Sequence, residues 1–344
     1  MNKLRQIIYA LKRMVQANPR LYQALYFVIT FNSNYFKQRL QIRQYPSQFG
    51  GQWINRKDFH IQLRQKSKRG LIDHDTENLI HKWQEDGFLV WKGAIAPALI
   101  DQLNEELNAL PHRHPAGLMI TGPDIEGCKP YRPESIKVHK SIRIVDYYFF
   151  SHATRAILLS KPLMSFLEIV FEKKPVLTQS LNFEYGSEQS IHQDTAFVIM
   201  NSPLQMAAIW VALQDVQPGS GELIYYPGSH LWADFLFSGR FKHFDKERDG
   251  LEQKNAWHAW LHAEAARRKT KLQSFLPAKG DAFLWHAALA HGGSPITNPG
   301  MTRRSLVGHY CAQGVRPLYH YYKPAQRKFY KADEYFYSSS YYKK

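Results

Sequence analysis

Two short polar runs, far apart in the sequence, constrain this chain more than any other feature. The first places His192 and Asp194 two residues apart, and the second places His291 directly before Gly292 and Gly293. Side chains at positions i and i+2 of a strand point to the same face, so His192 and Asp194 on a strand can reach one ion. The fold then has to bring His291 to the same place.

Two histidines and one carboxylate on one face of a metal ion leave the opposite face open, which is the ligand arrangement of non-haem Fe(II) oxygenases. The alternative for the first run is a surface strand with two polar residues in water. The flanking runs, 181–183 and 197–200, are apolar and are predicted to be buried strands. Because a buried polar pair is costly without a partner, these flanks favour a metal site.

Cysteine content and hydropathy limit the cellular setting. The chain has 344 residues, which suits one large domain with appendages or two smaller domains, and its only cysteines are Cys128 and Cys311. A disulfide framework is therefore excluded and a reducing compartment is expected, which suits ferrous iron. No apolar stretch is long enough to span a bilayer, and Lys12 and Arg13 interrupt the start of the chain. We expect a cytoplasmic protein without a secretory signal.

Positive charge is concentrated at the N-terminus. The net charge is +16, and residues 1–70 hold 14 Lys and Arg side chains against one acid, Asp58. Apolar residues within 3–16 follow helical spacing, with basic residues on the other side. This pattern fits either a basic amphipathic anchor on the inner face of a membrane or helices packed on the catalytic body. Residues 1–70 are predicted to be a basic helical extension and linker, and the polar, Gln-rich stretch 44–74 has the composition of a linker.

Beyond this extension, the pattern changes from helical to strand-like near residue 176. Helices are predicted over 75–86, 97–107, 146–171 and 256–269, and a loop over 111–135. Strands are predicted over 88–91, 176–185, 191–199, 206–214, 221–226, 281–286 and 303–311. This order favours an α+β fold with a barrel or double-sheet jelly roll over 71–315, followed by a Tyr- and Lys-rich tail over 316–344.

An ordered set of short motifs then points to a known family. The motifs are Glu85-Asp86-Gly87-Phe88, His192-Gln193-Asp194, Ile209-Trp210-Val211-Ala212-Leu213, Gly221-Glu222-Leu223, Pro227-Gly228-Ser229-His230, Lys279-Gly280-Asp281, His291-Gly292-Gly293-Ser294, Arg303-Arg304-Ser305 and His309-Tyr310. Over about residues 75–312 the chain resembles the phytanoyl-CoA dioxygenase family of Fe(II)/2-oxoglutarate oxygenases. Each motif alone is weak, whereas the ordered set is specific.

The resemblance implies a double-stranded β-helix, a jelly-roll core flanked by helices. It also implies that His192, Asp194 and His291 hold Fe(II), that 2-oxoglutarate chelates the iron, and that O2 is the second cosubstrate. An Arg beyond the second His would bind the far carboxylate of 2-oxoglutarate. Arg303 fits this role by its position and Arg304 is the alternative, since adjacent strand residues face opposite ways.

Two further residues are implied to bind the cosubstrate. Trp210 lies where the family lines the cosubstrate pocket, although a plain core Trp is an alternative, and Gln179 is a candidate hydrogen-bond donor to the keto-acid end. His230 and His286 are predicted to be structural. The insert 231–275 and the loop 111–140 are expected to border the pocket.

The resemblance implies hydroxylation of an unactivated C–H bond, with release of succinate and CO2. We expect a small-molecule or lipid-linked substrate, with peripheral membrane contact through the basic N-terminus. The alternative is a nucleic-acid-binding protein or a nucleic-acid-modifying oxygenase. This alternative is disfavoured because the basic residues lie outside the proposed barrel and no nucleic-acid motif is recognised.

Overall fold

A computed structural model describes residues 42–344, apart from 114, 123–124, 133–141, 319–327 and 343–344. The amphipathic segment predicted at 3–16 lies outside these residues. The described elements are, in order, η1(Trp53–Asn55), α4(Phe59–Lys68), α5(His74–Asp86), β1(Phe88–Trp91), α6(Pro97–Arg113), β2(Met119–Gly122), β3(Ile125–Pro130), β4(Arg143–Val145), η2(Tyr147–Phe149), α8(His152–Leu158), α9(Lys161–Phe171), β5(Pro175–Phe183), η3(Asp194–Ala196), β6(Met206–Ala212), β7(Leu223–Tyr225), η4(Ser229–Leu231), α10(Lys246–Arg268), β8(Gln273–Phe275), β9(Ala282–His286), β10(His291–Gly293), β11(Ser305–Ala312), β12(Tyr330–Ala332) and β13(Tyr335–Tyr337).

Two sheets form the core. The larger has ten strands, eight of which run in the order β1-β9-β6-β11-β5-β4-β2-β3, and the smaller has the order β10-β7-β8. Neighbouring strands are antiparallel except that β13 runs parallel to β5. Many neighbours are distant in sequence, so the register depends on which face each strand buries.

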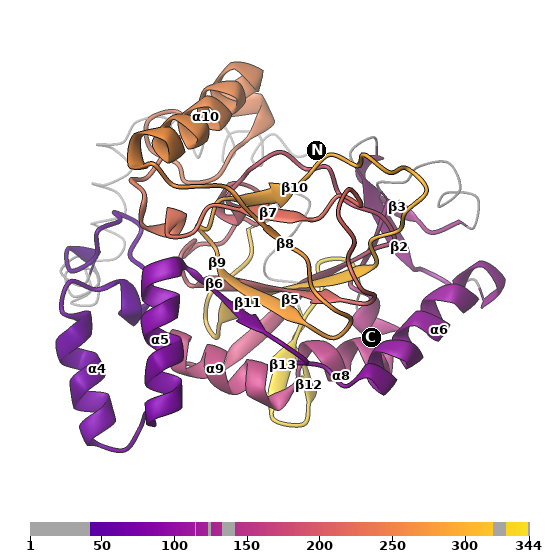
Figure 1. Ribbon diagram of the computed structural model, residues 1–344, viewed down its shortest axis with the longest axis horizontal. Coiled ribbons are helices and arrows are strands. Elements are labelled where there is room, and N and C mark those ends of the chain that lie inside the picture. The colour runs from indigo at the N-terminus through magenta and orange to yellow at the C-terminus, as the bar shows by residue number, and fades with distance from the viewer. Residues whose placement is uncertain (1–41, 114, 123–124, 133–141, 319–327, 343–344) are drawn as a thin grey trace, which may run out of the picture.

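The two faces of the large sheet have different coverings (Figure 1). On β6, Ile209 and Val211 pack into the cluster that contains α5, α6, α8 and α9, while Ala208 and Trp210 pack into the cluster shared with the small sheet. This alternation follows from the two-residue period of a strand. The result is a layer of helices, a large sheet and a small sheet, the mixed helical and antiparallel architecture expected around a jelly-roll core.

Capping residues at both ends of α5 fix where this helix stops and where β1 begins. The carboxylate of Asp73 accepts a hydrogen bond from Thr76 N at the start of α5. Gly87 ends α5 with a φ of 78°, which glycine adopts without strain. β1 follows at once and pairs with β9. The predicted helix and strand on either side of Gly87 are therefore confirmed.

The linker predicted over 44–74 is wrong. Residues 53–55 and 59–68 form η1 and α4, and Trp53, Ile54, Phe59 and Leu63 are buried in the main core. The basic and Gln residues that suggested a linker lie mostly on the outer side of α4, so composition hid a narrow apolar stripe. This segment belongs to the body of the protein.

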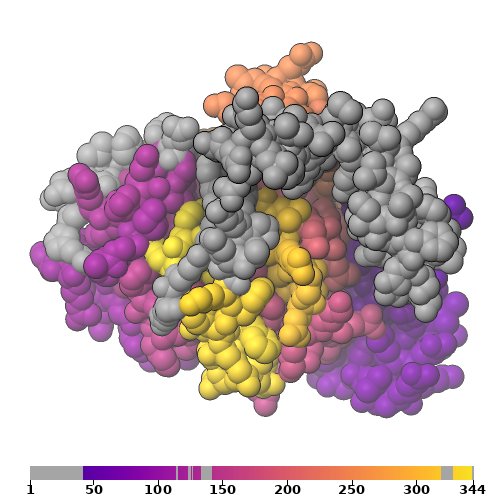
Figure 2. All heavy atoms as spheres, turned by 180° about the vertical axis from the view of Figure 1, so that it is seen from behind, coloured from indigo at the N-terminus to yellow at the C-terminus, as the bar shows by residue number. Residues whose placement is uncertain are grey.

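Residues 330–337 of the predicted tail are also built into the body. β12 and β13 form a hairpin, and Tyr335 and Tyr337 are buried against β5 and its neighbours. Figure 2 shows this segment, in yellow, as part of the rear surface. Two of the tail tyrosines therefore support the core instead of facing outward, because β13 extends the large sheet. Among the described residues, no helix is long and apolar enough to cross a membrane.

Two predictions within the barrel region are also wrong. The expected loop at 111–135 contains β2 and β3, which pair with each other and with β4. The expected strand at 191–199 is replaced by η3 and by a single bridge between His192 and His291. The β2–β3 register is irregular and β2 also pairs with the more distant β4, while the partner of His192 lies about a hundred residues away, so local pattern misjudged both segments.

Candidate metal centre and its cavity

The backbone brings the two polar runs together directly. His192 N donates to His291 O at 2.8 Å, and His291 N donates to His192 O at 2.9 Å. Asp194 then begins the turn η3, and its carbonyl accepts from the backbone N–H groups of Phe197 and Val198. The two residues of the first run therefore reach the same point through a turn and not through a regular strand.

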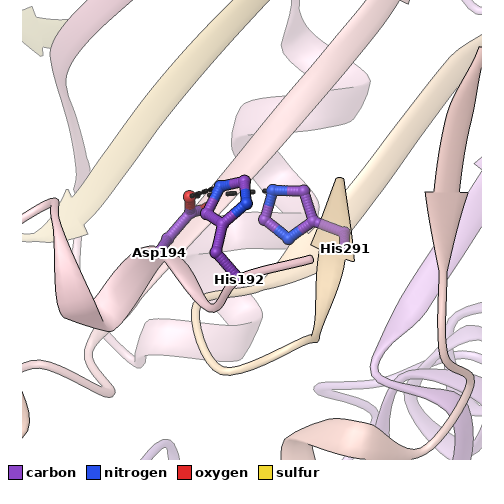
Figure 3. Close-up of side chains that lie close together, drawn as sticks. All are labelled: His192, Asp194 and His291. Carbon is purple, nitrogen blue, oxygen red and sulfur yellow. Dashed lines mark ion pairs between the residues drawn. The ribbon is translucent and has the colours of Figure 1, made fainter. Parts of the chain in front are cut away.

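The side chains of His192, Asp194 and His291 converge on one point (Figure 3). Their possible ligand atoms lie within 4.8 Å of one another, and all three residues are buried. Asp194 Oδ1 lies 3.8 Å from His192 Nε2 and 3.7 Å from His291 Nε2. These separations leave room for an ion that contacts all three atoms.

The tautomers of both imidazoles follow from their backbone partners. His192 Nδ1 lies 2.9 Å from Ser190 O, and His291 Nδ1 lies 3.0 Å from Leu289 O. A carbonyl only accepts, so Nδ1 of each ring carries the proton and donates it. The lone pair of each Nε2 then points into the cluster, as metal ligation requires.

Electrostatics favour a neutral ring for His192 and an ionised carboxylate for Asp194. Burial, reinforced by His291, lowers the pKa of His192 to about 3, so its ring is neutral near pH 7. For Asp194, burial alone would raise the pKa, but the three nearby imidazoles and the Trp285 N–H lower it overall. A neutral His192 imidazole and an ionised Asp194 carboxylate suit the binding of a divalent first-row metal.

A cavity of about 360 Å³ opens beside this cluster. Arg303, Trp210 and Gln179, the three residues implied to bind the cosubstrate, all line it together with the three candidate ligands. Trp210 Nε1 is buried and has no hydrogen-bond partner among the described residues. This cavity lies within the range of volumes of small-molecule sites.

The structure separates the two adjacent arginines. The side chain of Arg303 is buried, stacks 5.7 Å from the ring of Phe183 and 5.4 Å from that of Trp210, and forms no hydrogen bond or ion pair within the described part of the chain. Burial lowers the pKa of Arg303 to about 10. Arg304 instead pairs with Glu184 at 2.8 Å. Of these two adjacent residues, only Arg303 therefore offers its guanidinium to a ligand in the cavity.

The cavity is also lined by Arg143, Trp285 and His309, to which the sequence analysis gave no role in the site. Arg143 lies on β4, in a region without a strand prediction, and stacks 5.2 Å from the ring of Phe183. Trp285 and His309 lie within predicted strands, and the alternation of inward positions could have marked them. Which face points inward depends on the sheet register, which local sequence does not reveal.

The insert 231–275 lies behind the cluster instead of lining the cavity. Among the described residues of the insert, none borders the cavity, whereas Thr121, Ile125, Gly127 and Cys128 of the 111–140 segment do. The expectation for the insert is therefore wrong and that for 111–140 is confirmed. Figure 1 shows α10 beyond the small sheet, on the far side from α9.

Contacts from α10 reach the backbone that carries His192. His258 Nδ1 lies 3.1 Å from Ile191 O, and the ring of Trp257 lies 5.7 Å from that of Phe197. Ile191, Ala196 and Ala290 pack in the same apolar cluster as the insert. The insert therefore supports the turn from behind.

Fold and cluster together define the class of protein: the non-haem iron, 2-oxoglutarate-dependent oxygenases and related enzymes. The chain belongs to the phytanoyl-CoA dioxygenase (PhyH) family, whose model matches residues 83–305. No curated protein matches the sequence.

Two solved structures are similar in fold. The non-haem alpha ketoglutarate dependent epimerase SnoN from nogalamycin biosynthesis, crystallised with Fe3+, alpha ketoglutarate and nogalamycin RO, has a TM-score of 0.53 and 15% identity, covering 77% of this chain and 98% of SnoN. The alpha ketoglutarate dependent carbocyclase SnoK has a TM-score of 0.50 and 14% identity, covering 72% of this chain and 86% of SnoK. At this identity the likeness shows a shared fold.

Proposed function

We propose that this chain is an Fe(II)- and 2-oxoglutarate-dependent dioxygenase that hydroxylates an unactivated C–H bond of a small-molecule or lipid-linked substrate. The convergence of His192, Asp194 and His291 at the wall of a cavity that also contains Arg303 carries this proposal. When bound, iron and 2-oxoglutarate supply O2 activation coupled to the release of succinate and CO2. Family membership supports the cofactor assignment.

The chain's own residues have distinct tasks in this proposal. Nε2 of His192 and His291 and Oδ1 of Asp194 would hold the iron, and the cavity lies directly beside these three atoms. The apolar walls, which include Trp210 and Val307, limit water around the reacting centre.

The charge of the cavity matches a dicarboxylate. The Arg303 side chain forms no hydrogen bond or ion pair with described residues, and among the same residues the Arg143 side chain forms only a long hydrogen bond of 3.4 Å to Gln189. A buried guanidinium without a carboxylate partner is costly, and an anionic ligand removes that cost. 2-Oxoglutarate has a negative charge at each end, and Arg303 offers the planar, always-charged donor that a buried carboxylate requires.

Anaerobic titration tests the assignment. Fe(II) and 2-oxoglutarate added together should give the weak visible charge-transfer band of the chelate. His192→Ala and Asp194→Ala should each abolish the band while the unfolding temperature of the metal-free protein stays near that of the wild type. A wild-type protein that binds neither component would refute the proposal.

The substrate class is tested separately. A cavity of about 360 Å³ fits a small molecule or the end of a longer one, so metabolite profiling with the active enzyme is the direct search. Sedimentation with anionic vesicles at low and high salt tests peripheral membrane contact through the basic N-terminus. A steep salt dependence of RNA or DNA binding, without vesicle binding, would favour the nucleic-acid alternative.

A further inference from the structure

His309 is a buried polar side chain whose role the proposed ligand set does not explain. It lies on β11, is 4% exposed and lines the cavity. Its Nδ1 has no hydrogen-bond partner among the described residues, and its Nε2 lies 3.8 Å from Asp194 Oδ2, beyond hydrogen-bond distance. A buried imidazole without any hydrogen bond is rare, so a partner within reach needs to be identified.

The two oxygens of Asp194 face different neighbours. Oδ1 faces Nε2 of His192 and of His291, at 3.8 and 3.7 Å. Oδ2 accepts a hydrogen bond of 2.7 Å from the indole N–H of Trp285 and also faces His309. Oδ1 is therefore directed to the candidate metal site, and Oδ2 is directed to two potential N–H donors, Trp285 and His309.

We propose that His309 is a positioning residue which, together with Trp285, holds Oδ2 of Asp194 and so leaves Oδ1 alone to bind a divalent metal. This inference rests on the metal site in the proposed function. A shift of less than one ångström would bring His309 Nε2–H into hydrogen-bond distance of Oδ2, and Oδ2 can accept from both donors.

The sheet register places His309 and Trp285 near the same oxygen of Asp194. His309 lies opposite Ala208 of β6, and Ala208 lies opposite Trp285 of β9. His309 and Trp285 therefore stand two strands apart in one cross-strand row, with a small alanine between them. Asp194 reaches over this row from η3, so that its outer oxygen meets both rings.

The geometry also argues against His309 as a fourth ligand. The cluster that could hold a metal contains His192, Asp194 and His291, and His309 approaches the oxygen on the other side of the carboxylate. Two donors on Oδ2 would keep that oxygen from turning to the metal, so Asp194 would bind through one oxygen only. Binding through one oxygen would leave coordination positions available to the cosubstrate and O2.

The test uses the full chain and Co²⁺ as the probe metal. His309→Leu and Trp285→Phe should each weaken Co²⁺ binding by about 10- to 100-fold, the usual effect of removing a hydrogen-bond partner of a ligand. His309→Gln, whose amide N–H can take the place of Nε2–H, should restore most of the affinity. In the His309→Leu/Trp285→Phe double variant the visible Co²⁺ spectrum should change in position and intensity, because a freed Oδ2 alters the coordination number.

Tyr310→Phe is the matched control, because Tyr310 is buried, lies next on β11 and donates to Leu158 O instead of facing the cavity. It should leave Co²⁺ affinity unchanged. If His309→Leu does not fold, His309→Met replaces it in the comparison with His309→Gln. The inference would be overturned if the Co²⁺ affinity of His309→Leu or His309→Met equalled that of the wild type. It would also be overturned if His309→Gln lost as much Co²⁺ affinity as His309→Leu. Failure of the wild type to bind Co²⁺ would instead overturn the proposed metal site.

Discussion

His192 and His291 hydrogen-bond to each other through their backbones, at 2.8 Å and 2.9 Å, and so form an isolated antiparallel bridge. This bridge fixes the relative position of two candidate ligands without using their side chains. His291 is held in turn by β10, which pairs with β7 of the small sheet. Main-chain contacts therefore preform the candidate metal site. Side-chain variants can remove a ligand and leave these backbone contacts in place.

Loss of one imidazole should abolish metal-dependent stabilisation. Binding to the folded state alone stabilises by about 2.7 kcal/mol when the free metal is a hundredfold above Kd. We expect Co²⁺ or Fe(II) to raise the unfolding temperature of the wild type but not that of His291→Ala. Thermal unfolding with and without metal measures this difference. A variant that kept the full increase would show that the ion binds elsewhere.

Gly292 is predicted to be intolerant of any side chain. A Cβ at this position would lie 2.6 Å from Gln189 O and 3.1 Å from Ile191 N, both backbone atoms of the segment that leads to His192. Gly292→Ala should therefore destabilise the fold by about 1–3 kcal/mol and weaken metal binding as His192 is displaced. Urea unfolding and metal titration provide the two measurements.

Gly300→Ala is the control for this substitution. Its Cβ would meet only the side-chain oxygen of Asn298, at an ordinary 3.6 Å, so unfolding and metal binding should stay close to wild type. Equal effects of the two alanine substitutions would contradict the steric argument.

The adjacent arginines should differ sharply. Arg303→Lys should weaken 2-oxoglutarate binding by about 2 kcal/mol, or roughly 30-fold, since a lysine cannot form the bidentate contact with a buried carboxylate. Arg304→Lys changes a half-buried pair with Glu184 and should cost less than about 1 kcal/mol. Titration of the Fe(II)-loaded variants with 2-oxoglutarate makes the comparison. Larger losses for Arg304 would reverse the assignment.

Sequence patterns predicted the ligand residues better than the backbone that carries them. His192, Asp194 and His291 do converge, but through a bridge and a turn and not along a strand. The apolar run after Asp194 suggested a strand, whereas hydrogen bonds to Asp194 O from the N–H groups of Phe197 and Val198 close a turn. Local hydrophobicity does not distinguish a buried turn from a buried strand.

Several side chains that surround the candidate ligands could not be predicted from the sequence. Arg143 enters the cavity because β4 pairs with β5, and this pairing joins segments without a shared local signal. Trp285 and His309 become neighbours of Asp194 through the register of β9, β6 and β11. Sheet register across distant strands is a tertiary property, so one sequence could give the ligands but not their supporting side chains.

The stability of the protein should fall on acidification below about pH 6.5, because two buried histidines outside the metal site resist protonation. Burial lowers the pKa of His230 to about 4 and that of His286 well below its usual range, and the two rings lie 5.2 Å apart. Above about pH 6.5 both folded and unfolded chains leave these rings neutral, so they contribute no pH dependence. Below it the unfolded chain binds protons that the folded chain does not. Each buried ring therefore lowers the free energy of unfolding by up to about 1.4 kcal/mol per pH unit, until the pH reaches the pKa of that ring in the folded protein.

Urea unfolding between pH 7.5 and 5, with EDTA present to remove metal effects, measures this slope. His230→Gln should make the slope shallower, because glutamine cannot take up the proton in either state. His152→Gln provides the control, since the His152 side chain is exposed in the folded protein. If His230→Gln and His152→Gln changed the slope equally, the buried pair would not be the origin of the acid sensitivity.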